Sequence, residues 1–463
     1  MIKKLIKRMF GKTEKKTRSD GGPEPRIVPV SKHGIRREQI IPCALRVTDG
    51  LQQAGFAAFV VGGAVRDLLL GREPKDFDVA TDATPDEVRQ HFRRSRIIGR
   101  RFRIVHVMCG NETVEVSTFR APQAGEDDDD QHADEHGRLL RDNVWGNMAD
   151  DAIRRDFTVN ALFYDPAKQE VWDYQDGMQD MRKKVLRMIG DPATRYREDP
   201  VRMLRAARLA AKLGFTIDVA TRAPIAEMAD LLQNVPSARL FDEMLKLLLS
   251  GHSVECVRQL RAEGLHHGLL PMLDVILEQP LGEKFINIAL ANTDQRVRED
   301  KPVSPGFLFA ALLWHEVLAT MQQHEAAGMK PVPAMHAAMD DVLDVQRKEL
   351  AIPRRFDAIT KELWLLQPRF LQRGGGKPYR LLSHPRFRAA YDFLLLRCES
   401  GEVDREIGEW WTRFQDASDA DRAEMQLPDD APKKKRRRRT KPKRERGADE
   451  SVQQQDLPGI DAT

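Results

Sequence analysis

Hydrophobic and polar positions in the first part of the chain follow the patterns of short β-strands separated by helices. Residues 56–61 are a continuous apolar run, and residues 113–119 alternate between apolar and polar side chains, so both segments are predicted strands. The remaining elements expected here are strands at residues 77–80 and 103–108 and helices at residues 39–54 and 63–70. This region is therefore predicted to be a mixed α/β unit.

Beyond about residue 192, the apolar spacing is almost entirely helical. Residues 201–212, 240–249 and 307–319 are examples, each with the three-to-four-residue repeat of an amphipathic or buried helix. The predicted fold class is α+β, with a small mixed-sheet head followed by an all-helical neck and body and by disordered basic tails. The expected boundaries are 1–36 for a basic extension and linker, 37–190 for the head, 191–272 for the neck, 273–425 for the body and 426–463 for the basic tail.

Composition excludes several classes of protein. The chain has 463 residues, of which 41% are hydrophobic, and no apolar run approaches the roughly 18 residues that cross a bilayer. Four cysteines, Cys43, Cys109, Cys256 and Cys398, are scattered without paired spacing. That spacing argues against a disulfide framework, a zinc knuckle or a thioredoxin-like site. A soluble, cytoplasmic protein is expected.

Charge is distributed unevenly along the chain. Residues 433–446 carry eleven Lys or Arg and one Glu, and residues 1–18 carry eight Lys or Arg and one Glu, so the rest is acidic although the net charge is +4. An acidic body between basic tails indicates a polyanionic partner and favours a monomer. Residues 1–18 also have the spacing of a basic amphipathic helix, which would suit a membrane surface. We favour the simpler hypothesis of a terminus attracted to RNA.

Two further segments are predicted to lack regular structure. Residues 19–36 contain Gly and Pro punctuation and are interpreted as a linker. Residues 122–137 are rich in Asp and Glu, so a solvated acidic loop is expected. A metal site built from His132 and His136 is the alternative for this loop.

The candidate chemistry begins at Gly62-Gly63, which lies between a predicted strand and a predicted helix. Backbone N–H groups at such a turn can approach a phosphate closely, although an ordinary tight turn is the alternative. Asp76 and Asp78 follow, and alternate residues of a strand share one face. Two carboxylates on one face favour Mg²⁺ over the alternative of a solvated turn, and a two-metal site would activate a hydroxyl and stabilise a leaving oxygen. Glu115 is the candidate third catalytic carboxylate; it either reaches this site or faces solvent.

Four motifs in this order carry a family resemblance. They are Gly62-Gly63-x-Val-Arg-Asp, Asp76-x-Asp78, Arg154-Arg-Asp-Phe-Thr-Val-Asn-Ala-Leu162 and Arg197-Glu-Asp-Pro-Val-Arg-Met-Leu-Arg205. The region from about residue 38 to 250 resembles the class II nucleotidyltransferases, which comprise the bacterial poly(A) polymerases and the CCA-adding tRNA nucleotidyltransferases.

The resemblance implies roles for the matching residues. It assigns Gly62, Gly63 and Arg66 to the triphosphate, Asp76 and Asp78 to Mg²⁺ or Mn²⁺, Arg154, Arg155, Asp156 and Asn160 to the nucleotide and its ribose, and Asp199, Arg202 and Arg205 to the base. Physical chemistry agrees, because an Asp acceptor and an Arg fork can complement a base edge. Asp199 and Arg202 are three residues apart and are expected on one helical face. A surface ion pair is the alternative, and Arg239, Glu243 and Lys246 are expected to support the site.

Two stretches favour the poly(A) polymerase branch. Residues 97–107 resemble a segment typical of that branch, in which Arg100, Arg101 and Arg103 would contact phosphate or RNA while His106 is structural. Residues 381–392 resemble the body of the same branch. The mixture of basic and aromatic groups around it suits single-stranded RNA; its members are Arg369, Phe370, Arg373, Lys377, Tyr379, Arg380, Arg386 and Arg388. The alternative is a core of helices with exposed Arg head groups, and Phe387 and Tyr391 are expected in the core.

The predicted function is template-independent transfer of AMP from ATP to RNA 3′ ends with release of pyrophosphate. Lys433 and Arg436 belong to the basic tail, whose RNA affinity is expected to fall steeply with salt. The resemblance implies a role in marking RNA for decay, and hence partners in the decay machinery. Two alternatives are kept, a CCA-adding enzyme acting on tRNA and a non-catalytic RNA-binding protein on the same scaffold.

Overall fold

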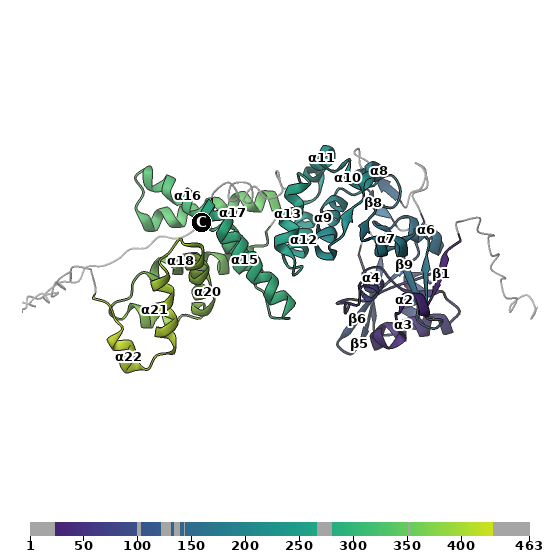
Figure 1. The fold of residues 1–463 in the computed structure, drawn as a ribbon, viewed down its shortest axis with the longest axis horizontal. Helices are drawn as coiled ribbons and strands as arrows, with labels where there is room; N and C mark the ends of the chain where they lie inside the picture. Colours follow the sequence, from purple (N-terminus) through teal and green to yellow (C-terminus); the bar gives the residue numbers. More distant parts are fainter. Residues whose placement is uncertain are drawn as a thin grey trace, which may run out of the picture.

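An eight-stranded mixed sheet forms the head, at the right of Figure 1, and the helical remainder extends from it. The strand order is β1-β10-β9-β2-β3-β6-β5-β4, and every neighbouring pair is antiparallel except β3 and β6. The strands are β1 Arg26–Pro29, β2 Ala58–Val61, β3 Asp78–Thr81, β4 Ser95–Ile98, β5 Ile104–Cys109, β6 Glu112–Thr118, β9 Leu162–Asp165 and β10 Glu170–Asp173. The computed structural model describes residues 24–99, 103–121, 131–133, 139–142, 144–265, 280–350 and 352–428.

Apolar residues fill both faces of this sheet, which explains the continuous apolar run of β2. Val60 belongs to the main core, whereas Phe59 and Val61 pack on the opposite face with Phe163 and Ala152. The predicted strands and helices of the head are confirmed within a few residues. The head helices are α2 Val30–His33, η1 Arg37–Gln39, α3 Pro42–Gln53, α4 Gly63–Leu69, α5 Pro85–His91, α6 Met148–Ile153, η2 Thr158–Asn160 and α7 Gly177–Lys183.

Two segments predicted to be irregular form strands. Residues 26–29, interpreted as linker, are the edge strand β1, which pairs with β10 and buries Val28. Within the predicted acidic loop, β7 Gln131–Ala133 pairs with β8 Leu139–Asp142 in an antiparallel hairpin. Both predictions were wrong for these residues, because pairing with a partner strand outweighs local composition. His136 of the alternative metal site lies outside the described residues.

The cysteine prediction was also wrong in part. Cys43 in the first turn of α3 and Cys109 at the end of β5 form a disulfide, with their Cα atoms 5.6 Å apart and a separation of 66 positions in sequence. Cys256 and Cys398 are buried free thiols. The fold packs α3 against β5, which spacing along the chain cannot reveal.

The helical remainder begins after the short parallel pair β11 Val185–Leu186 and β12 Thr216–Ile217. Its first part comprises α8 Pro192–Glu198, α9 Val201–Leu213, α10 Val219–Arg222, α11 Ile225–Met228, η3 Ala229–Asn234, α12 Ser237–Leu248 and α13 Ser253–Ala262. The second part comprises α15 Pro280–Arg298, α16 Pro305–Ala326, α17 Pro331–Leu350, η4 Arg354–Phe356, α18 Asp357–Phe370, α19 Lys377–Leu382, α20 Phe387–Ser400, α21 Arg405–Asp416 and α22 Asp419–Glu424. The predicted helices at 201–212, 240–249 and 307–319 are confirmed as α9, α12 and α16.

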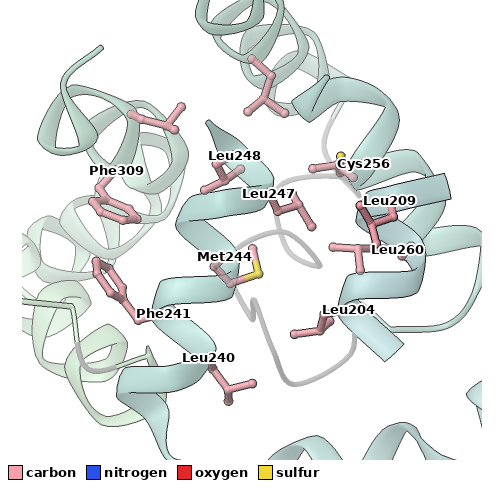
Figure 2. Packing of buried hydrophobic residues seen from close by; sticks show 14 of the residues in the cluster. Leu204, Leu209, Leu240, Phe241, Met244, Leu247, Leu248, Cys256, Leu260 and Phe309 are labelled. Atoms are coloured by element: carbon pink, nitrogen blue, oxygen red, sulfur yellow. The ribbon is translucent and has the colours of Figure 1, made fainter. Parts of the chain in front are cut away.

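Helix α12 joins the two helical parts through its buried side chains. Figure 2 shows Met244 and Leu247 of α12 directed toward α9 and α13, while Phe241 lies beside Phe309 of α16. The two phenyl rings are 5.8 Å apart between centroids. Both are buried, so the contact ties the neck to the body through apolar area removed from water. Among the described helices, none has the length and hydrophobicity that a membrane crossing requires.

Candidate active site

The glycine turn between β2 and α4 is the centre of the candidate site. Gly62 has φ +71°, a left-handed conformation that favours glycine, and it caps the N-terminus of α4. A Cβ atom at Gly62 would lie 3.5 Å from Nη1 of Arg155 and 3.9 Å from Oδ2 of Asp78. The turn, a cation and a carboxylate therefore meet at one point, as a site for a metal-bound phosphate requires.

Two of the carboxylates lie side by side on β3 and β6, one at the start of β3 and one in the middle of β6. Asp78 is the first residue of β3, and its register partner in the parallel strand β6 is Glu115. Asp76 precedes the strand and is exposed, while Phe77 between them is buried in the core. Asp76 therefore lies in the loop before the strand, and the predicted shared strand face does not extend to it. Glu115 is 53% exposed and its Oε1 lies 3.0 Å from Nε2 of His106, so it is both beside Asp78 and open to solvent.

Electrostatics at Asp78 indicate an excess of negative charge. Burial, together with the nearby charges of Glu115 and Asp76, raises the pKa of Asp78 to about 6, while Arg155 acts in the opposite direction. Among the residues that the structure describes, no three potential ligands are gathered closely enough to form a metal cluster. Even so, the oxygen donors of Asp76 and Asp78 suit a hard divalent cation, which would relieve this repulsion.

A buried hydrogen-bond network holds Arg66 of α4, the helix that follows the turn. Arg66 is 5% exposed, and it donates to Asn160 Oδ1 at 2.7 Å and to Asp67 Oδ1 at 2.7 and 2.8 Å. Asn160 in turn donates to Asp156 at 2.9 Å. Arg205 donates to the other oxygen of Asp156 at 2.5 and 2.9 Å. Three predicted nucleotide contacts, Arg66, Asp156 and Arg205, therefore use much of their hydrogen-bonding capacity within the protein.

This network sets the charge of Asp156. Burial alone would raise the pKa of Asp156, but the charge of Arg205 and hydrogen bonds from Asn160, Arg205 and the Phe157 amide hold that pKa well below its usual range. The same ion pair raises the pKa of Arg205. Both groups are charged at neutral pH, so their ion pair links the head to α9.

Several arginines lie close to one another near the turn. Burial lowers the pKa of Arg154 to about 9, and the neighbouring charges of Arg120, Arg195, Arg202 and Arg155 contribute. Burial also lowers the pKa of Arg120 and of Arg195. Such a crowd of cations beside a glycine turn is suited to a polyanion such as a triphosphate.

The predicted base-reading pair has a different geometry from the one expected. Helix α8 ends at Glu198, and Pro200 separates it from α9, so Asp199 and Arg202 do not share one helical face. Asp199 Oδ2 accepts from Arg239 at 2.6 Å. Arg202 instead donates to Glu198 at 2.8 Å, an ion pair four residues apart. The expectation of a shared helical face was wrong because the helix breaks between the two residues.

One carboxylate oxygen of Asp199 is a candidate contact for a ligand. Oδ1 of Asp199 is buried and has no hydrogen-bond partner within the described part of the chain. Buried acceptors are normally satisfied, so this oxygen is a candidate acceptor for a ligand N–H group. The supporting prediction for α12 agrees with its contacts, since Arg239 holds Asp199 and Lys246 pairs with Glu243 at 2.8 Å.

Sequence reasoning missed Arg195 and Glu198. Both are about one-eighth exposed and pair with each other at 2.6 Å. Arg195 also reaches the backbone carbonyls of Arg154 and Arg155, which lie 41 and 40 residues away along the chain. The spacing of Arg195, Glu198 and Arg202 at three and four residues signals ion pairs, but nothing in the sequence predicts the contact with residues 154–155.

The predicted RNA contacts are spread over the head and body. Arg103 lies 3.4 Å from Asp86, and Arg100 and Arg101 lie outside the described residues, as do Lys433 and Arg436. The body arginines Arg373, Arg386 and Arg388 pair with Glu406, Glu362 and Asp392, while Arg369 and Arg380 are exposed. Whether these side chains contact RNA stays a prediction.

The aromatic part of that prediction was wrong for Phe370. This ring is fully buried and packs on Trp411, so it cannot stack on a base. Tyr379 packs edge-on against Phe414 and is only partly buried, so its contact with RNA stays a prediction. Phe387 and Tyr391 are buried as expected, and their rings stack on each other.

Known proteins match this arrangement along most of the chain. Residues 58–187 match the family described as the poly A polymerase head domain. Residues 214–277 match the probable RNA and SrmB-binding site of polymerase A, and residues 327–445 match the polymerase A arginine-rich C-terminus. The poly(A) polymerase I of Salmonella typhi is 45% identical over 434 residues, which are 91% of this chain and 92% of that protein.

The chain belongs to the bacterial poly(A) polymerase family.

As a member of this family, the chain is a nucleotidyltransferase. CCA-adding enzymes are more distant: the one from Lactobacillus helveticus is 37% identical over 210 residues, which are 45% of this chain and 50% of that enzyme. The crystal structure of the Bacillus stearothermophilus CCA-adding enzyme in complex with CTP has a TM-score of 0.54 at 25% identity, with 81% of each chain covered. The poly(A) polymerase family thus shares its fold with the CCA-adding enzymes.

Proposed function

We propose that this chain transfers AMP from ATP to the 3′-hydroxyl of RNA without a template and releases pyrophosphate. The meeting of Asp78, Glu115 and Arg155 around the Gly62 turn carries this proposal. It supplies carboxylates for metal, amide N–H groups for phosphate and a cation for developing charge, which together are the parts that phosphoryl transfer needs.

Asp76 and Asp78 are the residues that would hold Mg²⁺ or Mn²⁺, and Glu115 is a third carboxylate within reach of Asp78. When bound, divalent ions supply charge stabilisation for the attacking and leaving oxygens. The raised pKa of Asp78 supports this assignment, because a cation would offset the repulsion from Asp76 and Glu115.

The other residues of the site would bind and orient the nucleotide. The amide groups of Gly62 and Gly63 would contact the phosphates, with Arg154 and Arg155 neutralising the pyrophosphate that leaves. Arg66 and Asp156 would hold these groups in place through their hydrogen bonds with Asn160, which would contact the ribose.

Asp199 and Arg202 would read the base. The unpartnered Oδ1 of Asp199 suits the exocyclic amino group of adenine, and Arg202 would donate to an adjacent ring nitrogen. Arg239 and Glu198 fix the two side chains by ion pairs. Exposed and buried arginines of the head and body, together with Lys433 and Arg436 in the basic tail, would hold the RNA, and the product would mark RNA for decay.

Replacing Asp199 with Ala is expected to lower kcat/KM for ATP about 10- to 100-fold, as the loss of a charged buried acceptor predicts. RNA affinity should be unchanged, because the base pocket does not hold the primer. Steady-state kinetics on a short RNA check this result. Asp230→Ala removes an exposed carboxylate from the neck and is the matched control. An Asp199 variant with the ATP kinetics of that control would contradict the assignment.

An extension assay on a gel tests the function itself. The purified chain with Mg²⁺ meets either a generic single-stranded RNA or a tRNA lacking its CCA end, with ATP, CTP or both. Long ladders from ATP on the generic RNA are expected. Three added nucleotides on tRNA, requiring both triphosphates, would instead support a CCA-adding enzyme. No product under any condition would support a non-catalytic RNA-binding protein.

A further inference from the structure

Arg195 connects two parts of the site that are far apart in sequence. It lies in α8 and is 12% exposed. Its Nη2 donates to the carbonyl oxygens of Arg154 at 2.5 Å and Arg155 at 2.9 Å. These carbonyls are at the end of α6, where the last carbonyls of a helix lack intrahelical partners. One face of the Arg195 guanidinium therefore fixes the turn that carries Arg154 and Arg155.

The other nitrogen of the same guanidinium faces the base-reading residues. Nη1 of Arg195 donates to Glu198 Oε2 at 2.6 Å, and that oxygen also accepts from Arg202 at 2.8 Å. Arg202 donates back to the Arg195 carbonyl at 2.8 Å. Arg202 is thus held by α8 rather than by Asp199.

A continuous path of short contacts follows from these distances. It begins at Arg155, whose guanidinium lies beside the Gly62 turn, and runs from the 154–155 carbonyls through Arg195 and Glu198 to Arg202. One end of the path is beside the predicted phosphate position and the other end is beside the predicted base position. The planar, rigid fork of an arginine can hold both ends at a fixed separation, whereas a flexible ammonium cannot.

We propose that Arg195 is a positioning residue that sets the separation between the phosphate-binding turn and the base-reading Arg202, and thereby contributes to the choice of ATP over CTP. The inference rests on the proposed function of the same site. Arg195 touches no reacting atom; it acts through Glu198 and through the backbone of residues 154–155. With the separation fixed, a purine that spans it is oriented for transfer, and a smaller pyrimidine is not.

The test measures kcat and KM separately for ATP and for CTP on a short single-stranded RNA with Mg²⁺. Arg195→Ala is expected to lower kcat/KM for ATP about 10- to 100-fold and kcat/KM for CTP much less, because charge-assisted hydrogen bonds are lost. The ratio of the two values should therefore fall about 10-fold or more. Arg195→Lys should not restore the ratio, since one ammonium group cannot replace the fork. RNA affinity should match that of the unsubstituted chain.

Arg187→Ala is the matched control. Arg187 bonds two carboxylates, Asp180 of the head at 3.1 Å and Asp218 of the neck at 2.7 Å, and therefore also links the two parts of the chain by buried or half-buried ion pairs. Its loss is expected to lower the melting temperature without changing the ratio of ATP to CTP use. A merely structural role of Arg195 would give the same pattern, with lower stability and an unchanged ratio, and that result would overturn the proposal.

Glu198→Gln keeps the proposal testable if both Arg195 variants fail to fold. This substitution weakens the link between Arg195 and Arg202 but leaves the hydrogen bonds from Arg195 to the 154–155 carbonyls in place. The ratio of kcat/KM for ATP to kcat/KM for CTP should therefore fall again. An unchanged ratio in a folded Glu198→Gln chain would overturn the proposal. Failure of the proposed function is distinguishable, because the unsubstituted chain would then extend RNA with neither nucleotide.

Discussion

Replacing Asp78 with Asn is expected to lower turnover by about 10³-fold or more while RNA binding persists. A metal-held carboxylate contributes several kcal/mol to the stabilisation of transition-state charge, and each 1.4 kcal/mol is a factor of ten in rate. Asp76→Ala should act in the same direction. Single-turnover extension assays give the rate, and filter binding of a labelled RNA gives the affinity.

The same substitution should not weaken the fold. Asp78 is partly buried beside Glu115 and Asp76, so its negative charge opposes folding when no metal is bound. In EDTA, the melting temperature of Asp78→Asn is therefore expected to equal or exceed that of the unsubstituted chain. Asp49→Asn, which removes a carboxylate from the surface ion pair with Arg37, is the control. Normal turnover of the Asp78 variant would falsify the metal assignment.

Replacing Asp156 with Asn is expected to cost about 1.5–3 kcal/mol of unfolding free energy, because it removes charge-assisted hydrogen bonds between a buried carboxylate and Arg205, which is itself about one-third exposed. Activity should fall as well, since Asn160 and Arg66 would lose their anchor. Urea unfolding followed by circular dichroism measures the change.

The pH dependence of this effect has a definite sign. The pKa of Asp156 is depressed in the folded state, so its contribution to stability is complete above the unfolded value of about 4 and is lost as pH falls through the folded value. The difference between the two chains should therefore shrink only in strongly acidic solution. Asp86→Asn, which removes an exposed ion pair with Arg103, should change stability by no more than about 0.5 kcal/mol. A similarly small change for Asp156→Asn would contradict the interpretation that the ion pair between Asp156 and Arg205 stabilises the fold.

Local patterns were reliable where one segment carries its own signal. The apolar run that became β2 is buried on both faces of the sheet, and the alternation that became β6 buries one, so period and burial agree. The glycine turn was also predictable, because only glycine readily adopts φ +71° between a strand and a helix. By contrast, edge strand β1 escaped notice, because its four residues are stabilised by β10 rather than by their own pattern.

The candidate site was predictable in its residues but not in their partners. Family motifs identified Asp78, Asp156 and Asp199 from order and spacing alone. Each of these carboxylates finds its principal charged neighbour from a distant segment: Glu115, Arg205 and Arg239 respectively. Their spacing instead placed Asp199 and Arg202 on one helical face, and the break at Pro200 removed that arrangement.

The sequence by itself determined the mixed-sheet head, the helical remainder, the order of the catalytic motifs and the basic tails, because each is a property of a contiguous stretch. Only the tertiary structure decided which buried charges neutralise each other, that Cys43 meets Cys109, and that Phe370 belongs to the core rather than to an RNA surface. It also decided that Arg195 spans α8 and the 154–155 turn. The physical reason is that hydrogen bonds and ion pairs act over a few ångströms in space, and a sequence records separation along the chain only.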